Sequence, residues 1–300
     1  MIYVKILITG ANGHSGRIFL NKLEEEHSKL FDEVHIVVRK NNLDEFIKNS
    51  KLNIIKHQGD LNDSEFVKEI TQDKDIILHI AGIQMSKVLF EKSVQNKVGW
   101  IIAIHTTGRY SKFKSASAEY IEIEDKLLEL RDEINITILR PTMIYGSSRD
   151  KNMNKLIKFI DKFPIYPIFG NGKNLMQPVN AKDLARAYIQ VIENSDITKN
   201  QNYNLSGKYP EKYKYLINTV SKHLDKKTIL IKLPIFISYF LVKFSRNIIP
   251  KFPLNEEQVL RMKEDKDFTH LKATEDFGYN PMAFEEGIKE EINEYKRKIK

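Results

Sequence analysis

The first 140 residues alternate short apolar runs with longer amphipathic segments, and this alternation restricts the fold more than any other feature. The runs are rich in β-branched residues and predict strands at residues 2–9, 33–38, 52–57, 75–80, 100–105 and 134–140. Helical periodicity is predicted between them, over residues 15–28, 63–71, 86–97 and 115–132. Strands that are almost wholly apolar are typical of parallel sheets covered on both faces. The chain is therefore predicted to be an α/β protein with a doubly wound parallel sheet.

A glycine-rich turn follows the first predicted strand, in ILITGANGHSG, residues 6–16. A turn from strand into helix leaves backbone N–H groups unpaired at the helix start, and these groups together with the helix dipole favour an anion. Gly10 permits the tight turn, Gly13 lets the backbone approach a pyrophosphate, and Gly16 allows close packing of helix on strand. The turn therefore predicts dinucleotide binding.

The pattern loosens after residue 146. Helices are predicted over residues 151–162, 181–194, 211–224 and 282–298, separated by loops marked by proline and glycine. We expect residues 1–146 to form the dinucleotide-binding domain. Residues 147–300 are expected to form a smaller, mostly helical, substrate-binding lobe that completes the same compact unit.

Composition excludes several classes of function. The chain has no cysteine, so disulfides, thiolate metal sites and cysteine nucleophiles are excluded. Its net charge is +8, but the basic residues are scattered and form no nucleic-acid-binding motif. No histidine group has metal-ligand spacing, so no metal site is predicted. The chain opens without signal-peptide architecture, which makes a cytoplasmic location the expectation.

Several stretches together resemble the extended and atypical short-chain dehydrogenases/reductases, whose cofactor domain is a Rossmann fold. They cover nearly the full length of the chain and occur in the order that this superfamily shows. These stretches are TGANGHSG (9–16), Gly59-Asp60-Leu61, ILHIAG (77–82), ILRPTMIYG (138–146), FGNG with QPVNAKDLA (169–185) and DFGYNP (276–281).

The resemblance implies a nicotinamide dinucleotide cofactor that contacts the glycine turn and the ends of the following strands. Asp60 matches an acidic element that contacts the adenine, and the sixth-strand exit at Pro141 lines the nicotinamide. The cofactor-binding residues predicted from the turn and the resemblance are Gly10, Asn12, Gly13, His14, Ser15, Gly16, Arg39, Lys40, Asp60, Leu61, Ala81, Gly82 and Pro141.

The end of the second predicted strand indicates which dinucleotide is preferred. An acidic residue at that position binds the ribose hydroxyls of NAD. This strand ends instead in Arg39-Lys40, and a guanidinium matches a 2′-phosphate in charge and fork geometry. NADP(H) is the predicted cofactor, with NAD(H) as the alternative, and a solvated basic strand end is the non-functional interpretation.

Catalysis in this superfamily uses a Tyr-x-x-x-Lys pair, in which a nearby ammonium favours the phenolate form of the tyrosine, and a Ser or Thr that orients the substrate. Thr107, Tyr110 and Lys114 match these residue types. Tyr110 follows Thr107 much sooner than the family pattern places it. Tyr120 is an alternative, but Glu124 occupies the position of its lysine. The catalytic set therefore stays open between these pairs and a relocated or degenerate site.

The resemblance implies an oxidoreductase or epimerase that moves a hydride between nicotinamide and a carbonyl or carbinol carbon. A nucleotide-sugar or related carbohydrate is the first candidate substrate. However, Met176-Gln177-Pro178 replaces the arginine-containing triplet that holds the substrate diphosphate in such enzymes. The alternatives are a non-catalytic NADP(H)-binding sensor or assembly protein, and a membrane-surface oxidoreductase acting on a lipid or isoprenoid.

Residues 229–253 form the most apolar segment of the second half. Its longest charge-free stretch, Leu233 to Val242, is too short to span a bilayer. We expect a buried helix of the second lobe. A lid over an apolar substrate is one alternative, and a contact with a membrane surface, fringed by Lys232, Lys243 and Arg246, is the other.

Overall fold

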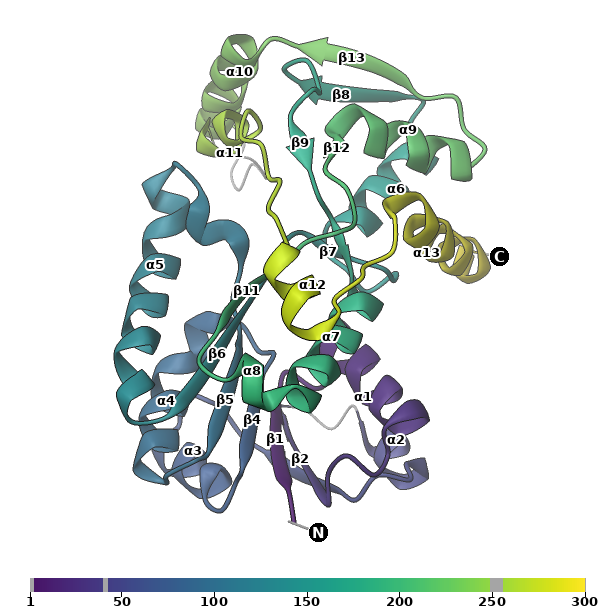
Figure 1. Cartoon of the computed structure of the whole chain (residues 1–300). Coiled ribbons are helices and arrows are strands. Elements are labelled where there is room, and N and C mark those ends of the chain that lie inside the picture. The colour runs from purple at the N-terminus through teal and green to yellow at the C-terminus, as the bar shows by residue number, and fades with distance from the viewer. Residues whose placement is uncertain (1–2, 40–42, 249–255, 300) are drawn as a thin grey trace.

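The computed structural model describes residues 3–39, 43–248 and 256–299. Figure 1 shows a central sheet with helices on both faces and a second group of elements beyond one end of the strands. The seven strands are all parallel and run in the order β11-β6-β5-β4-β1-β2-β3, which confirms the predicted doubly wound sheet. They are β1 (Lys5–Thr9), β2 (Glu33–Val38), β3 (Ile54–Gln58), β4 (Ile76–His79), β5 (Trp100–Ile104), β6 (Asn135–Pro141) and β11 (Asn202–Leu205).

One face of the sheet is covered by α1 (His14–Glu26), α7 (Ala181–Glu193) and α12 (Leu271–Phe277). Their buried side chains pack on Ile6, Ile8 and Ile36 of the strands. Phe19 of α1 meets Tyr188 of α7 edge to face, with ring centroids 5.9 Å apart. This contact joins the first helix of the chain to a helix from its second half.

The other face is covered by α3 (Ser64–Thr71), α4 (Ser86–Gln95) and α5 (Lys114–Glu129). The side chain of Asp63 caps α3 by accepting hydrogen bonds from the backbone N–H groups of Glu65 (3.0 Å) and Phe66 (3.2 Å). Spaced apolar residues on these helices, such as Val67 and Leu89, are fully buried against the strands. A short helix absent from the sequence prediction, α2 (Asp44–Asn49), precedes β3.

The second lobe packs α6 (Met153–Lys162), α9 (Tyr213–His223) and α13 (Phe284–Ile299) around a separate apolar core. Three small two-stranded sheets accompany these helices. The short helix α8 (Ser195–Thr198) lies elsewhere and contacts α7 and α12 beside the main sheet. The three small sheets pair β7 (Ile144–Tyr145) with β10 (Val179–Asn180), β8 (Ile165–Phe169) with β13 (Ile229–Leu233), and β9 (Leu175–Met176) with β12 (Glu211–Lys212). The predicted helical character of this lobe is confirmed.

The chain crosses between the two halves more than once. After residue 146 it returns to the sheet as α7 and β11, and again as α12. Residues on both sides of the predicted boundary therefore build the main core.

The structure corrects the prediction for residues 229–253. The described part of this segment is the strand β13 followed by the helix α10 (Ile235–Ile248), because Pro234 separates the two elements. Most of the helix is not buried: among its described side chains only Ser238 and Val242 are buried, and most of the others are exposed. The short helix α11 (Glu256–Arg261) contacts α10.

Candidate functional site: a glycine turn beside a cleft

The glycine turn joins β1 to α1 with the close backbone contacts that its sequence predicts. Gly10 has φ +71°, and a Cβ there would lie 2.5 Å from the backbone nitrogen of Ala81. A Cβ at Gly16 would lie 2.3 Å from the Gly10 oxygen. Gly13 precedes α1, and no side chain caps this helix start. The turn thus presents uncapped backbone N–H groups, and the glycines beside them have no side chains to cover these groups.

The loop that follows β7 belongs to the second lobe, and it contacts the glycine turn. His14 Nδ1 lies 2.8 Å from Ser147 Oγ, and Arg149 donates a hydrogen bond to the Asn12 oxygen at 2.9 Å. Burial lowers the pKa of His14, which favours its neutral form. Ser15, the next residue of α1, is buried. These contacts tie the glycine turn to the lobe expected to bind the substrate.

Arg17 is a candidate cofactor residue that the sequence prediction missed. Its guanidinium stacks over the ring of Phe46 on α2, 4.8 Å from the centroid. Its Nη1 atom is buried and has no hydrogen-bond partner among the described residues. Burial is the larger cause that lowers the pKa of Arg17, and the nearby positive charge of Arg149 is the smaller one. The guanidinium groups of Arg17 and Arg149 thus both lie near the turn. The available signal was an arginine directly after the third glycine.

The other predicted cofactor residues lie at the carboxyl edge of the same sheet. Arg39 is exposed just beyond β2, whereas Lys40 lies outside the described residues. Asp60 is exposed after β3 and accepts a hydrogen bond from the Asn62 N–H at 2.9 Å. Leu61 is buried, and Ala81 and Gly82 follow β4. Because the strands are parallel, all these groups share one edge.

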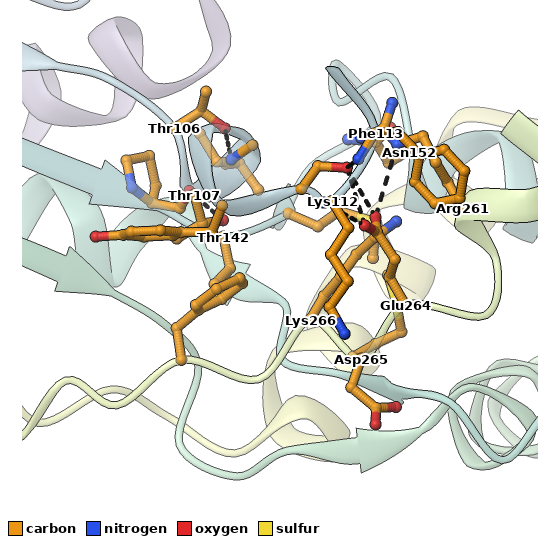
Figure 2. Close-up of a pocket in the computed structure, with 18 of the residues that line it drawn as sticks. Thr106, Thr107, Lys112, Phe113, Thr142, Asn152, Arg261, Glu264, Asp265 and Lys266 are labelled. Atoms are coloured by element: carbon orange, nitrogen blue, oxygen red, sulfur yellow. Dashed lines mark hydrogen bonds and ion pairs between the residues drawn. The ribbon is translucent and has the colours of Figure 1, made fainter. Parts of the chain in front are cut away.

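A cleft of about 970 Å³ opens between the sheet edge and the second lobe. Figure 2 shows Thr106, Thr107 and Thr142 on one side of it, and Arg261, Glu264 and Lys266 on the other. Tyr110 and the strand exit at Pro141 also line it. Thr107 Oγ1 donates a hydrogen bond to the Pro141 oxygen at 3.3 Å, which fixes the hydroxyl at the sheet edge.

The predicted catalytic pair is divided between two elements. Tyr110 ends the 3₁₀ turn η2 (Thr107–Tyr110), whereas Lys114 is the exposed first residue of α5. The intervening Ser111 and Phe113 are extended, so the two residues do not share one helical face. The Tyr110 hydroxyl donates to Asn204 Oδ1 at 3.3 Å, and its ring lies against Phe268 with centroids 5.3 Å apart.

The alternative, Tyr120, faces a buried ionic cluster. Its ring meets His105 edge to face, with centroids 5.7 Å apart. Glu124, one helical turn further along α5, is fully buried and accepts a hydrogen bond from Arg140 Nε at 2.8 Å. Arg140 Nη2 and Arg109 Nη1 also pair with this carboxylate. Where the family pattern has a lysine, this chain thus has a carboxylate neutralised by two guanidinium groups.

The far side of the cleft contains charged residues that sequence patterns did not single out. Glu264 accepts hydrogen bonds from Ser111 Oγ at 2.9 Å and from the Lys112 N–H at 2.7 Å, which fixes this side to the sheet edge. Lys266 also lines the cleft, and burial, followed by the charge of Arg261, lowers its pKa. Arg261 Nε is buried without a hydrogen-bond partner among the described residues, 3.8 Å from Glu264. The far side of the cleft therefore carries two basic side chains, Arg261 and Lys266, together with the carboxylate of Glu264.

Two family models match successive parts of the chain. The 3-beta hydroxysteroid dehydrogenase/isomerase family matches residues 7–99, and the NAD dependent epimerase/dehydratase family matches residues 103–206. The matched stretches contain the glycine turn, the strand exits and the threonines of the cleft. They confirm the resemblance to the extended short-chain dehydrogenases/reductases. No curated protein matches the chain in a sequence comparison.

Solved structures of the same fold cover nearly the whole chain. UDP-glucuronic acid 4-epimerase from Bacillus cereus, in complex with UDP-glucuronic acid and NAD, is 17% identical with a TM-score of 0.77, over 98% of this chain and 99% of the epimerase. UDP-glucose 4-epimerase from Thermotoga maritima is 18% identical with a TM-score of 0.74, over 99% and 100%. The dTDP-glucose 4,6-dehydratase DesIV from Streptomyces venezuelae is 15% identical with a TM-score of 0.77, over 98% and 97%. At these identities the likeness establishes the fold.

The buried cluster predicts a large cost for removing Glu124. Glu124→Ala leaves Arg140 without its buried counter-charge, and we expect it to lower the free energy of unfolding by about 3–5 kcal/mol. The measurement is urea denaturation followed by circular dichroism. Glu122→Ala, two residues earlier on the same helix, removes only an exposed pair with Lys126 and should change stability by less than about 0.5 kcal/mol. Equal effects of the two substitutions would contradict a structural role for the cluster.

Proposed function

We propose that this protein is an NAD(P)(H)-dependent oxidoreductase or epimerase acting on a carbonyl or carbinol carbon. The observation that carries the proposal is the common edge shared by the bare glycine turn and the cleft. Parallel strands bring both to their carboxyl ends, where ligands of doubly wound sheets bind. The bound nicotinamide would supply or accept the hydride. The side chains of this protein would bind it, orient the substrate and move the proton.

The residues of the turn fit a dinucleotide. There is no room for a Cβ at Gly10 or Gly16, so the backbone at Gly10 approaches Ala81 and the backbone at Gly16 approaches Gly10 more closely than any other residue type would allow. The uncapped start of α1 offers N–H donors to a pyrophosphate, and the unpartnered Nη1 of Arg17 offers another. His14 and Asn12 are already held by contacts from the second lobe.

A preference for NADP(H) over NAD(H) is supported by the position of Arg39. Arg39 is exposed directly after β2, where the ribose-contacting residue of a Rossmann fold lies. Arg17, the residue after the third glycine of the turn, stacks on Phe46 of α2. A 2′-phosphate bound beside Arg39 would meet a guanidinium that matches it in charge and fork geometry.

Within the cleft, Thr107 and Tyr110 are the proposed groups that contact the reacting carbon's oxygen. The hydroxyl of Thr107 is fixed on the strand exit and would orient the substrate carbonyl. The Tyr110 hydroxyl is the proposed acid/base, and the guanidinium groups of Arg109 and Arg140 lie 5.7 and 5.8 Å from its ring centroid. Lys114 stays part of the proposal through the family pattern alone.

The charged side of the cleft supports an anionic substrate, with a nucleotide-sugar or related carbohydrate as the leading class. Met176-Gln177-Pro178 lacks the arginine used for a diphosphate in similar enzymes. Arg261, Lys266 and Lys112 are basic residues of the same cleft lining, and Lys266 pairs with Met176 in an isolated parallel β-bridge. An anionic group of the substrate beside Lys266 would oppose the lowering of its pKa by burial.

A second candidate is a protein that binds NADP(H) without turnover and acts as a sensor or assembly subunit. The separation of Tyr110 from Lys114 on different elements favours it, because the ammonium that activates the tyrosine in similar enzymes lies outside the cleft lining. The buried salt bridges of Glu124 are consistent with a structural use of the neighbouring helix.

Arg39 is predicted to set cofactor preference. Arg39→Ala should weaken NADPH binding about tenfold or more while changing NADH affinity little, because only the former has a 2′-phosphate. Isothermal titration of both cofactors measures this. Lys48→Ala, which removes one exposed charge from neighbouring α2, serves as the matched control and should leave both affinities unchanged. An unaltered preference in Arg39→Ala would exclude the assignment.

Tyr110 is predicted to be required for turnover and not for cofactor binding. Tyr110→Phe should lower the rate of NADPH oxidation on a panel of carbonyl compounds and nucleotide-sugars by about a hundredfold or more, since proton transfer contributes that much. Tyr209→Phe, at an exposed tyrosine outside the cleft lining, should have no effect.

Two results would redirect this assignment. Full activity in Tyr110→Phe with loss in Tyr120→Phe would move the acid/base to the α5 position. Tight NADPH binding with no turnover on any compound, by the wild type as well, would support the non-catalytic candidate.

A further inference from the structure

Helix α10 exposes an apolar row along its whole length. Ser238 and Val242, four residues apart, face inward. A second row at the same spacing faces solvent, with exposed fractions of 66% at Phe236, 63% at Phe240, 66% at Phe244 and 61% at Ile248. Ile237 and Leu241 beside this row are also exposed. A helix on the surface of a soluble domain normally turns polar residues outward, so this distribution is inverted.

Exposed apolar residues continue onto the strands that precede the helix. Ile229 and Ile231, on one face of β13, are exposed, and so is Ile165 of β8, which pairs with Ile229. Figure 1 shows β13 and α10 together at the end of the molecule farthest from the sheet. We call the exposed apolar residues of α10, Phe236, Ile237, Phe240, Leu241, Phe244 and Ile248, the α10 face.

The segment that carries the α10 face is uniformly basic. From Lys226 to Asn255 the sequence contains no aspartate or glutamate, although the whole chain has 40 of them. The same segment contains six basic residues: Lys226, Lys227, Lys232, Lys243, Arg246 and Lys251. Lys232 and Lys243 are exposed next to the apolar residues. Exposed apolar side chains and positively charged side chains thus occur together in one segment.

We propose that α10 is an in-plane anchor that docks this protein on an anionic lipid bilayer. The aromatic row would enter the boundary between headgroups and acyl chains, and the flanking ammonium groups would lie at the level of the lipid phosphates. No helix in the described part of the chain is long and apolar enough to cross a membrane, so docking is the mode that this helix permits.

Charge favours a bilayer over a second copy of the chain as the occupant. A symmetric dimer through the α10 face would bring the same basic segments of two copies against each other. Arg246 and Lys226 already pair with Glu256 and Asp161 outside the segment. The exposed Lys232 and Lys243 would meet like charges of the second copy and repel them. An anionic surface is instead complementary to every charged residue that the segment contains.

Docking through α10 would place the bilayer next to the cleft. Helix α11 packs against α10. Arg261, the last residue of α11, and Glu264, which follows it, both line the cleft. The proposed anchor thus adjoins one side of the candidate active site. Docking on a bilayer does not depend on the function proposed above.

Vesicle co-sedimentation of the full chain tests the anchor. The wild type should bind vesicles of phosphatidylcholine mixed with phosphatidylserine, bind vesicles of pure phosphatidylcholine far more weakly, and lose affinity as salt is raised. The triple variant Phe236→Ser, Phe240→Ser, Phe244→Ser should lose at least about tenfold in affinity for the mixed vesicles. Lys232→Glu with Lys243→Glu should abolish the preference for phosphatidylserine.

A matched variant controls for general surface hydrophobicity. Ile197→Ser, Tyr209→Ser, Ile299→Ser removes three exposed apolar side chains elsewhere and should bind like the wild type. Thermal melts establish that each variant is folded, and light scattering reports self-association. Equal binding by the two triple variants would overturn the proposal. So would a wild-type dimer that the α10 variant dissociates and that anionic vesicles leave intact.

Discussion

The close approach of backbone at Gly10 is the contact on which the arrangement of the site depends. Gly10 lies against the chain leaving β4, and Gly16 lies against Gly10, so β1, β4 and α1 meet without intervening side chains. This meeting point lies between β4 and β1, where the strand order of the sheet reverses. The crevice of a doubly wound sheet opens at that position, and the start of α1 is therefore directed to where a ligand binds. Contacts from Ser147 and Arg149 then fix the second lobe against the same turn.

Sequence reasoning succeeded where the determinants are local. Apolar runs predicted the strands, and glycine spacing predicted a turn that the structure shows with positive φ at Gly10. It missed Arg17, the Glu124 cluster and the contact of Ser111 with Glu264, because their partners are distant in sequence or on other elements. It was wrong to expect burial of the helix in the described part of residues 229–253, since apolar composition does not reveal which side of a helix faces the protein.

The two halves of the candidate site rest on different kinds of support. The proposed cofactor half follows from backbone geometry, which the glycines enforce. The chemical half depends on side chains whose expected pairing is altered: Tyr110 and Lys114 are on separate elements, and a carboxylate follows Tyr120 where a lysine is expected. The tightly held Glu264 and the exposed face of neighbouring α10 add features to the second lobe that the superfamily pattern does not describe.

Isothermal titration of the wild type and of Gly13→Asp with NADPH tests most directly whether the glycine turn holds the dinucleotide. Gly13 has φ −71° and lies just before α1, where aspartate is a favourable cap, so the melting temperature can report that the variant is folded. The wild type should bind one NADPH per chain. The folded variant should bind about a hundredfold more weakly, because its carboxylate opposes the pyrophosphate. Equal affinity of the two proteins, or no binding of NADPH or NADH by the wild type, would contradict the account.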